Sequence, residues 1–170
     1  MLNRLKTMLA APEPQLPKPR YDANLAAAAL MVRVIAADGV FEPRELERMR
    51  SILLANYDLS QREADDLIAD ARVADEEAID LYGFTSVLKS EMDESERLGL
   101  VEDLWEMVYA DGSLHEAEDN VVWRVAELLG ITADKRIALK VRVKRRTKGQ
   151  GPEDRGPEDR GPEGRGREGR

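Results

Sequence analysis

Apolar residues recur at helical spacing through most of residues 21–146, and no stretch there alternates convincingly with a period of two. Residues 24–37 are apolar through their centre except for Arg33, which predicts a helix buried on most sides in the middle of a bundle. Asp22 is a suitable N-cap for this helix, and Gly39 is expected to end it in a left-handed conformation. The pattern therefore predicts an all-α domain.

Further helices follow at positions marked by residues that start or weaken a helix. Pro43 suits a first helical position, Ser60 and Asp93 each open a capping box, and Thr132 caps the last helix. Gly83 weakens the fourth helix without ending it. The remaining helices are expected at about residues 43–55, 60–75, 75–92, 93–111, 115–129 and 132–146, which gives a bundle of about seven helices.

Two segments of different composition flank the helical domain. Residues 1–20 comprise a short amphipathic segment, residues 1–11, and a linker that contains four prolines. Residues 147–170 are built on a repeated Gly-Pro-Glu-Asp-Arg unit that has no apolar residue able to seed a core. We therefore divide the chain into residues 1–20, a helical domain at residues 21–146, and a C-terminal tail at residues 147–170 that is predicted to be disordered.

The formal net charge of −8 conceals two regions of opposite sign. Residues 21–134 carry 27 acidic and 9 basic side chains, whereas residues 135–146 carry seven basic and no acidic ones. The acidic body disfavours nucleic acid and favours a cation or a basic protein partner. The basic stretch could contact nucleic acid or anionic lipid, but we favour the interpretation that it folds back on the acidic body. Residues 1–11 could add a weak contact with a membrane surface.

Composition also excludes several classes of chemistry. The chain has no cysteine, which excludes disulfides, thiolate zinc sites and cysteine nucleophiles. No apolar run reaches the length of a membrane span and no secretory signal is visible, so we expect a cytoplasmic protein. There is no Gly-rich phosphate loop and no nucleophile elbow. We therefore expect neither enzyme activity nor an organic cofactor, with general-base chemistry at His115 as a weak alternative.

One motif occurs twice, at Ala37-Asp38-Gly39 and at Ala110-Asp111-Gly112, with the two aspartates 73 residues apart. Each copy follows an apolar helical pattern and precedes another helix. In the overlay, Glu42 is equivalent to His115, and Glu45 is equivalent to Glu118. The repeat predicts a duplicated helix-loop-helix unit and two pseudo-symmetric halves.

An aspartate at the carboxyl end of a helix lies next to the negative end of the helix dipole, so it is expected to have a compensating partner. A turn across the following glycine, the start of the next helix and a metal ion are three such partners. If the two halves face one another, Asp38, Glu45, Asp111 and Glu118 would converge, with His115 on the same helix face as Glu118. We therefore name these five residues as the candidate ligands of one divalent metal ion, although local turn and cap roles are the interpretation that we favour.

The motif differs from the common metal-binding patterns. The twelfth position counted from Asp38 is Met49, and from Asp111 it is Val122, so the bidentate glutamate of an EF-hand is missing. His115 precedes its glutamate, whereas di-iron helices carry Glu-x-x-His. Residue 119 is Asp, so the second histidine of His-Glu-x-x-His is also missing.

The two Ala-Asp-Gly stretches, together with Arg124-Val-Ala-Glu-Leu-Leu-Gly-Ile131, resemble the TerB-like tellurite-resistance family of bacteria over residues 22–146. The resemblance implies an all-α domain of two pseudo-symmetric halves, an acidic surface, and a metal-linked role in stress response or resistance to tellurite-type oxyanions. It also implies an interaction module, because the domain occurs fused to others, including J-domain co-chaperones. The positions that match the family motif are Asp38, Gly39, Glu45, Asp111, Gly112 and Glu118.

Overall fold

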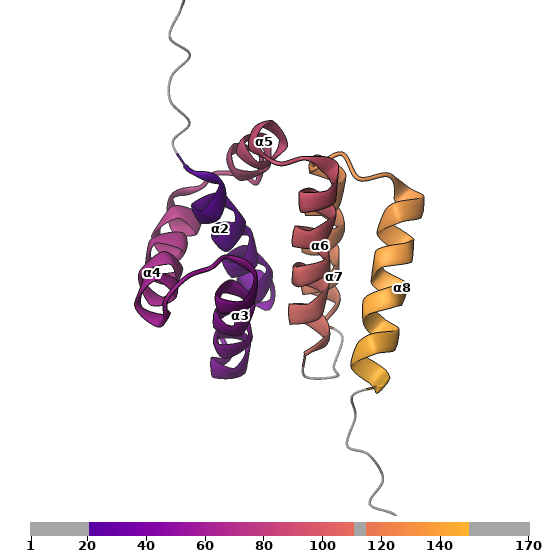
Figure 1. The fold of residues 1–170 in the computed structure, drawn as a ribbon, viewed down its shortest axis with the longest axis horizontal. Helices are drawn as coiled ribbons and strands as arrows, with labels where there is room; N and C mark the ends of the chain where they lie inside the picture. The colour runs from indigo at the N-terminus through magenta and orange to yellow at the C-terminus, as the bar shows by residue number, and fades with distance from the viewer. Residues whose placement is uncertain (1–20, 111–114, 150–170) are drawn as a thin grey trace, which may run out of the picture.

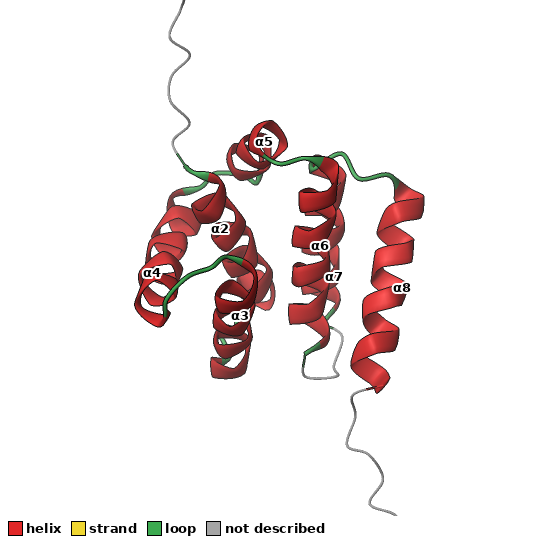
Figure 2. Ribbon diagram, viewed as in Figure 1, coloured by secondary structure: helices red, strands yellow, loops and turns green. Residues whose placement is uncertain are grey.

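The computed structural model describes residues 21–110 and 115–149, and these residues form seven α-helices, one short 3-10 helix and no strand (Figures 1 and 2). The all-α prediction and the expected number of helices are therefore confirmed. The predictions for residues 1–20, for the loop at 111–114 and for the tail from residue 150 onward lie outside the described residues. The elements are α2 (Ala23–Ile35), η1 (Ala36–Asp38), α3 (Pro43–Asn56), α4 (Gln61–Glu77), α5 (Tyr82–Glu91), α6 (Glu94–Tyr109), α7 (Glu116–Leu128) and α8 (Ala133–Gly149).

Helix α2 lies in the middle of the bundle, as its apolar sequence predicts. It packs against α4, α5, α6 and α7, with α4 on one side of it in Figure 1 and α6 and α7 on the other. Four consecutive alanines, residues 26–29, are fully buried, and their small side chains let the neighbouring helices approach closely. Leu30, Met31, Val34 and Ile35 continue the buried surface. No helix in the described part of the chain is long and apolar enough to cross a membrane.

The helix starts follow the predicted caps. The Asp22 carboxylate accepts a hydrogen bond of 2.7 Å from the Leu25 N–H. Ser60 and Asp93 begin α4 and α6 with capping boxes, and Pro43 is the first residue of α3. Gly130 has a φ of +76° immediately after α7, which is the left-handed geometry that ends a helix. These boundaries depend on local chemistry, and for that reason they could be predicted from sequence.

The prediction of one helix from residue 75 to residue 92 is wrong. Helix α4 continues through Asp75 to Glu77, and α5 begins only at Tyr82. Asp75 is held inside the last turns of α4 because Arg33 of α2 bonds both its carboxylate, at 2.6 Å, and its backbone carbonyl, at 3.1 Å. The break falls instead at residues 78–81, where the Asp80 carboxylate accepts from the Tyr82 N–H at 2.9 Å.

The basic stretch folds back on the acidic body, which confirms the favoured interpretation. Helix α8 lies along α6, at the edge of the bundle (Figure 1). Its inner face buries Leu139 and Val143. Ion pairs flank this contact: Lys135 pairs with Glu94, Arg142 with Glu102 at 2.5 Å, and Arg146 with both Glu102 and Glu106.

Candidate metal centre

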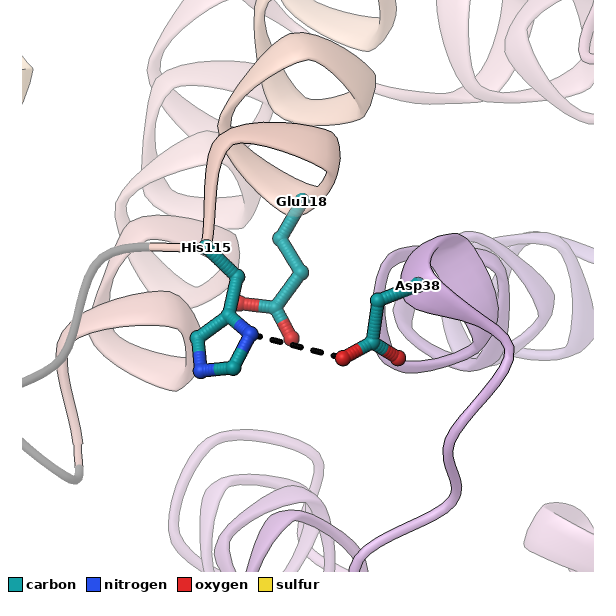
Figure 3. Close-up of side chains that lie close together, drawn as sticks. All are labelled: Asp38, His115 and Glu118. Carbon is teal, nitrogen blue, oxygen red and sulfur yellow. Dashed lines mark ion pairs between the residues drawn. The ribbon is translucent and has the colours of Figure 1, made fainter.

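The first Asp-Gly junction closes a tight turn at the end of α2. Gly39 has a φ of +80°, in the left-handed region that favours glycine, and its N–H bonds the Ala36 carbonyl. The Asp38 Oδ1 accepts a hydrogen bond of 2.8 Å from the Val40 N–H, which is the predicted turn across the glycine. This bond occupies one carboxylate oxygen and fixes the direction of the other, Oδ2, toward α7 (Figure 3).

The second junction delivers a histidine and a glutamate from the start of α7. His115 is the N-cap residue of this helix, and Glu118 stands three residues later in its first turn. Figure 3 shows both side chains directed at Asp38 across the gap between η1 and α7. Asp38 of the first motif copy therefore faces His115 and Glu118, which stand at the start of the helix that follows the second copy.

The three side chains form a compact cluster. His115 Nδ1 lies 3.4 Å from Asp38 Oδ2, and one ligand atom from each of Asp38, His115 and Glu118 lies within 4.8 Å of the others. A charge-assisted N–H···O bond is usually about 2.7–2.9 Å long, so the histidine and aspartate are too far apart for a strong one. Two ligands that are each about 2.1 Å from one ion are themselves about 3–4 Å apart. The distance between His115 Nδ1 and Asp38 Oδ2 therefore lies within the range of two ligands of one ion.

The three side chains of the cluster differ in how far they are exposed to solvent. The side chains of His115 and Asp38 are 41% and 26% exposed, whereas Glu118 is only 3% exposed. A carboxylate taken out of water needs compensation by hydrogen bonds or by opposite charge. The positive end of the α7 dipole supplies part of it, because Glu118 lies in the first turn of that helix. The cluster is therefore open on one side and anchored in the core on the other.

Two further residues, Glu45 and Asp111, were predicted as ligands. Glu45 occupies the third position of α3, and its carboxylate accepts a bond of 3.2 Å from the N–H of the N-cap residue Glu42. It is not part of the three-residue cluster, although it lines a cavity of about 10 Å³ together with Glu118. Such a cavity is at the lower limit of the space that one water molecule needs. Asp111 lies outside the described residues.

Two pairs of overlaid residues occupy equivalent positions in their helices. Glu42 and His115 are both N-cap residues, and Glu45 and Glu118 both stand three residues further on. In the first copy the glutamate caps its own helix, so the local role considered from sequence is confirmed for Glu45. Asp38 combines both roles, because one oxygen closes the turn and the other faces the second copy.

One residue beside the cluster was not predicted to have its own partner. Asp119 follows Glu118, but its carboxylate lies 2.7 Å from Lys140 Nζ of α8. The lysine nitrogen also lies 5.0 Å from the ring centre of Trp105 and 5.6 Å from that of Trp123. Burial, together with the charge of Asp119, raises the pKa of Tyr109 in the same region. Lys140 is 21 residues from Asp119 in the chain and lies on a different helix, so the local sequence around Asp119 gives no sign of this pairing.

The donor set suits a divalent ion on chemical grounds. Two carboxylates balance a charge of two, and an imidazole nitrogen adds a ligand that first-row transition metals accept readily. Carboxylate oxygens alone would suit Ca²⁺ or Mg²⁺, whereas the histidine shifts the preference toward Mn²⁺ or Zn²⁺. Asp38, His115 and Glu118 are the residues that would hold the ion. Three protein ligands also leave coordination positions for water.

The fold and this cluster define a class: a small all-α domain in which two acid-bearing helix junctions meet at a candidate cation site. The chain can be placed more narrowly. Residues 24–141 match the family model described as tellurite resistance protein TerB, and the chain therefore belongs to the TerB family. No curated protein and no solved structure gives a significant match.

Proposed function

We propose that this TerB-family domain is a non-enzymatic stress-response module that binds one divalent cation between its two Asp-Gly junctions. Asp38, His115 and Glu118 are the proposed ligands. The observation that carries the proposal is the mutual distance of their ligand atoms, all within 4.8 Å although the motif copies are 73 residues apart. Glu45 and Asp111 complete the set predicted from sequence. Glu45 caps α3 and shares a cavity of about 10 Å³ with Glu118.

Cation binding would act on the arrangement of the helices. Asp38 is the last residue of η1, which directly follows α2, whereas His115 and Glu118 lie at the start of α7. An ion bound between them would therefore link α2 and α7. Because the ion binds only the folded arrangement, it stabilises that arrangement in proportion to its concentration and affinity. The domain would then report the availability of the cation through the rigidity of this junction, a mechanism that needs no catalytic residue.

Calorimetric titration of the full chain with Mn²⁺, Zn²⁺, Ca²⁺ and Mg²⁺ tests the proposal. We expect saturable heat at one ion per chain, with Mn²⁺ or Zn²⁺ binding more tightly than Ca²⁺ or Mg²⁺. His115→Gln and Asp38→Asn should each weaken binding about tenfold or more. Glu116→Gln is the matched control, because Glu116 is an exposed acid of the same helical turn that lies outside the cluster. Absence of heat with all four ions, or equal heat in His115→Gln, contradicts the proposal.

A metal-independent adaptor that docks a basic partner is the second candidate. Helix α8 neutralises acids of α6 and α7, whereas Asp66, Asp70 and Glu76 on α4 remain exposed. An acidic helix face of this kind attracts basic segments through long-range charge. The adaptor predicts binding of a basic peptide that weakens as salt rises and that is unchanged in His115→Gln. A peptide that binds only in the presence of the cation would argue against it. A membrane contact through residues 1–11 stays a prediction.

A further inference from the structure

Large apolar side chains that remain exposed are concentrated in two places on this domain. In the described part of the chain six such residues exceed 40% exposure, and five of them fall in two patches. One patch contains Val73 at 54%, Ile79 at 102% and Tyr82 at 68%, and the other contains Ile137 at 54% and Val141 at 42%. Single exposed apolar residues are ordinary on a protein surface, but clusters mark contact sites.

The first patch, the acidic corner, surrounds the turn between α4 and α5. Its apolar members are Val73 at the end of α4, Ile79 in the turn, and Tyr82 at the start of α5. Its charged members, Asp70, Glu76 and Asp80, are all acidic and exposed. The acidic corner consists of Asp70, Val73, Glu76, Ile79, Asp80 and Tyr82.

The second patch, the basic face, is the outer stripe of α8. Ile137, Val141, Lys144 and Arg145 follow one another at helical intervals and therefore share one side of the helix. The opposite side carries Leu139 and Val143, which are buried against the bundle. Four other cations of α8 pair with acids of α6 or α7, namely Lys135, Lys140, Arg142 and Arg146. Arg136 instead lies over the ring of Trp123, and within the described residues Lys144 and Arg145 make no ion pair.

The two patches are complementary in both charge and apolar character. The acidic corner offers an isoleucine and a tyrosine among carboxylates, and the basic face offers an isoleucine and a valine beside two cations. They cannot meet within one molecule, because α4 and α8 lie at opposite ends of the longest dimension of the fold (Figure 1). A contact between them therefore requires two copies of the chain.

We propose that copies of this chain associate head to tail, with the basic face of α8 of one copy seated on the acidic corner of the next. The contact is heterologous, so each copy has one donor patch and one acceptor patch. Because both patches are small, the association is weak, reversible and favoured at high concentration. Attraction between opposite charges orients the encounter, and the apolar pairs provide the contact. The proposal is independent of cation binding.

Sedimentation velocity of the full chain over a wide range of concentration tests the proposal. We expect the average sedimentation coefficient to rise with concentration and the rise to diminish in high salt. Ile79→Asp and Val141→Asp should each weaken association about tenfold or more, because each places a carboxylate in the apolar contact. Val40→Asp is the matched control, since Val40 is 55% exposed and belongs to neither patch.

Mixing the two variants gives the decisive outcome. Ile79→Asp retains its basic face and Val141→Asp retains its acidic corner, so an equimolar mixture should form dimers and nothing larger. Dimer formation also demonstrates that both variants are folded. A mixture that stays monomeric overturns the proposal. Loss of association in Val141→Asp but not in Ile79→Asp also overturns it, because that result means that α8 pairs with itself. Constant sedimentation of the unaltered chain at all concentrations excludes the association outright.

Discussion

Gly39 sets the direction in which Asp38 faces the second junction. Its φ of +80° is accessible to glycine at little cost, whereas a residue with a Cβ is strained there. A Cβ added at this position would meet no atom within 4 Å, so the backbone conformation alone accounts for the requirement. The turn then places one Asp38 oxygen on the Val40 N–H and leaves the other for His115.

Replacing Gly39 tests this role of the backbone. We expect Gly39→Ala to lower the free energy of unfolding by about 1 kcal/mol, measured by urea denaturation. Gly39→Asn is the control and should cost less, because asparagine tolerates the left-handed conformation better than alanine does. Equal stability of the alanine variant and the unaltered chain would show that the turn has another conformation in solution.

Asp103 is an acid whose surroundings disfavour its charge. Burial, assisted by the neighbouring Glu102, raises its pKa from 3.8 to about 6, although Asn56 donates a hydrogen bond of 2.8 Å to its carboxylate. The folded chain therefore binds this proton more tightly than the unfolded chain does. The raised pKa therefore has no effect on stability below about pH 4, where the carboxyl is protonated in both states, and it lowers stability progressively as the pH rises through about 6.

We predict that Asp103→Asn stabilises the folded chain at pH 7 by roughly 1–2 kcal/mol, a value reduced for partial exposure to solvent. The gain should disappear in acid, where the carboxyl is protonated in both states. Urea denaturation at the two pH values measures it. Glu94→Gln provides a control of opposite sign, because a hydrogen bond from Lys135 lowers the pKa of Glu94 and stabilises the charged form. A loss of stability in Asp103→Asn at pH 7 contradicts the prediction.

At the scale of helices, α2 and α4 are joined by the only charge in the apolar centre of α2. Arg33 is 35% exposed at its side chain, and it reaches the 11% exposed carboxylate of Asp75. Burial raises the pKa of Asp75, and the charge of Arg33 opposes that effect without overcoming it. The pair thus fixes the end of α4 against α2, at a position that the sequence pattern alone assigned to the start of another helix.

We expect Arg33→Met to preserve the apolar packing of α2 but to lower the free energy of unfolding at neutral pH by about 1–3 kcal/mol. The loss arises because Asp75 would keep its burial without its cation. Thermal unfolding of Arg33→Met and of the double variant Arg33→Met/Asp75→Asn separates the two contributions. The double variant should recover part of the stability. If it is no more stable than the single variant, the unpaired carboxylate is not the cause of the loss.

Local chemistry explains which elements could be predicted from the sequence. The starts of α2, α4 and α6 depend on Asp22, Ser60 and Asp93, each of which bonds a backbone amide three residues away. The division between α4 and α5 depends instead on Arg33, which is 42 residues from Asp75 in the chain. Periodicity carries no information about such a contact, and the predicted boundary was accordingly wrong.

At the scale of the whole molecule, the candidate site depends on how the end of η1 and the start of α7 face one another. Repetition of the motif in the sequence was sufficient to nominate Asp38, His115 and Glu118, which the fold brings together. It could not distinguish them from Glu45, which caps α3. Both glutamates occupy the same position in their helices, so the difference lies in packing: Glu118 lies beside Asp38 at the end of η1.

The distribution of charge over the domain also depends on how the helices pack together. Helix α8 brings its basic residues onto acids of α6 and α7, and the acidic character of α4 is left without such cover. The composition of residues 135–146 indicated that the segment would fold back. It could not indicate which cations would stay on the outer face, because that depends on the rotation of α8 about its axis.

Anomalous diffraction from crystals of the full chain grown with Mn²⁺ tests most directly whether the two junctions share an ion. We expect one manganese peak per chain, within about 2.0–2.3 Å of ligand atoms of Asp38, His115 and Glu118. The peak should be missing in crystals of His115→Gln grown in the same way. Manganese bound at another place, or density in the unaltered chain that shows a direct bond between His115 and Asp38 with no ion, would contradict the proposed site.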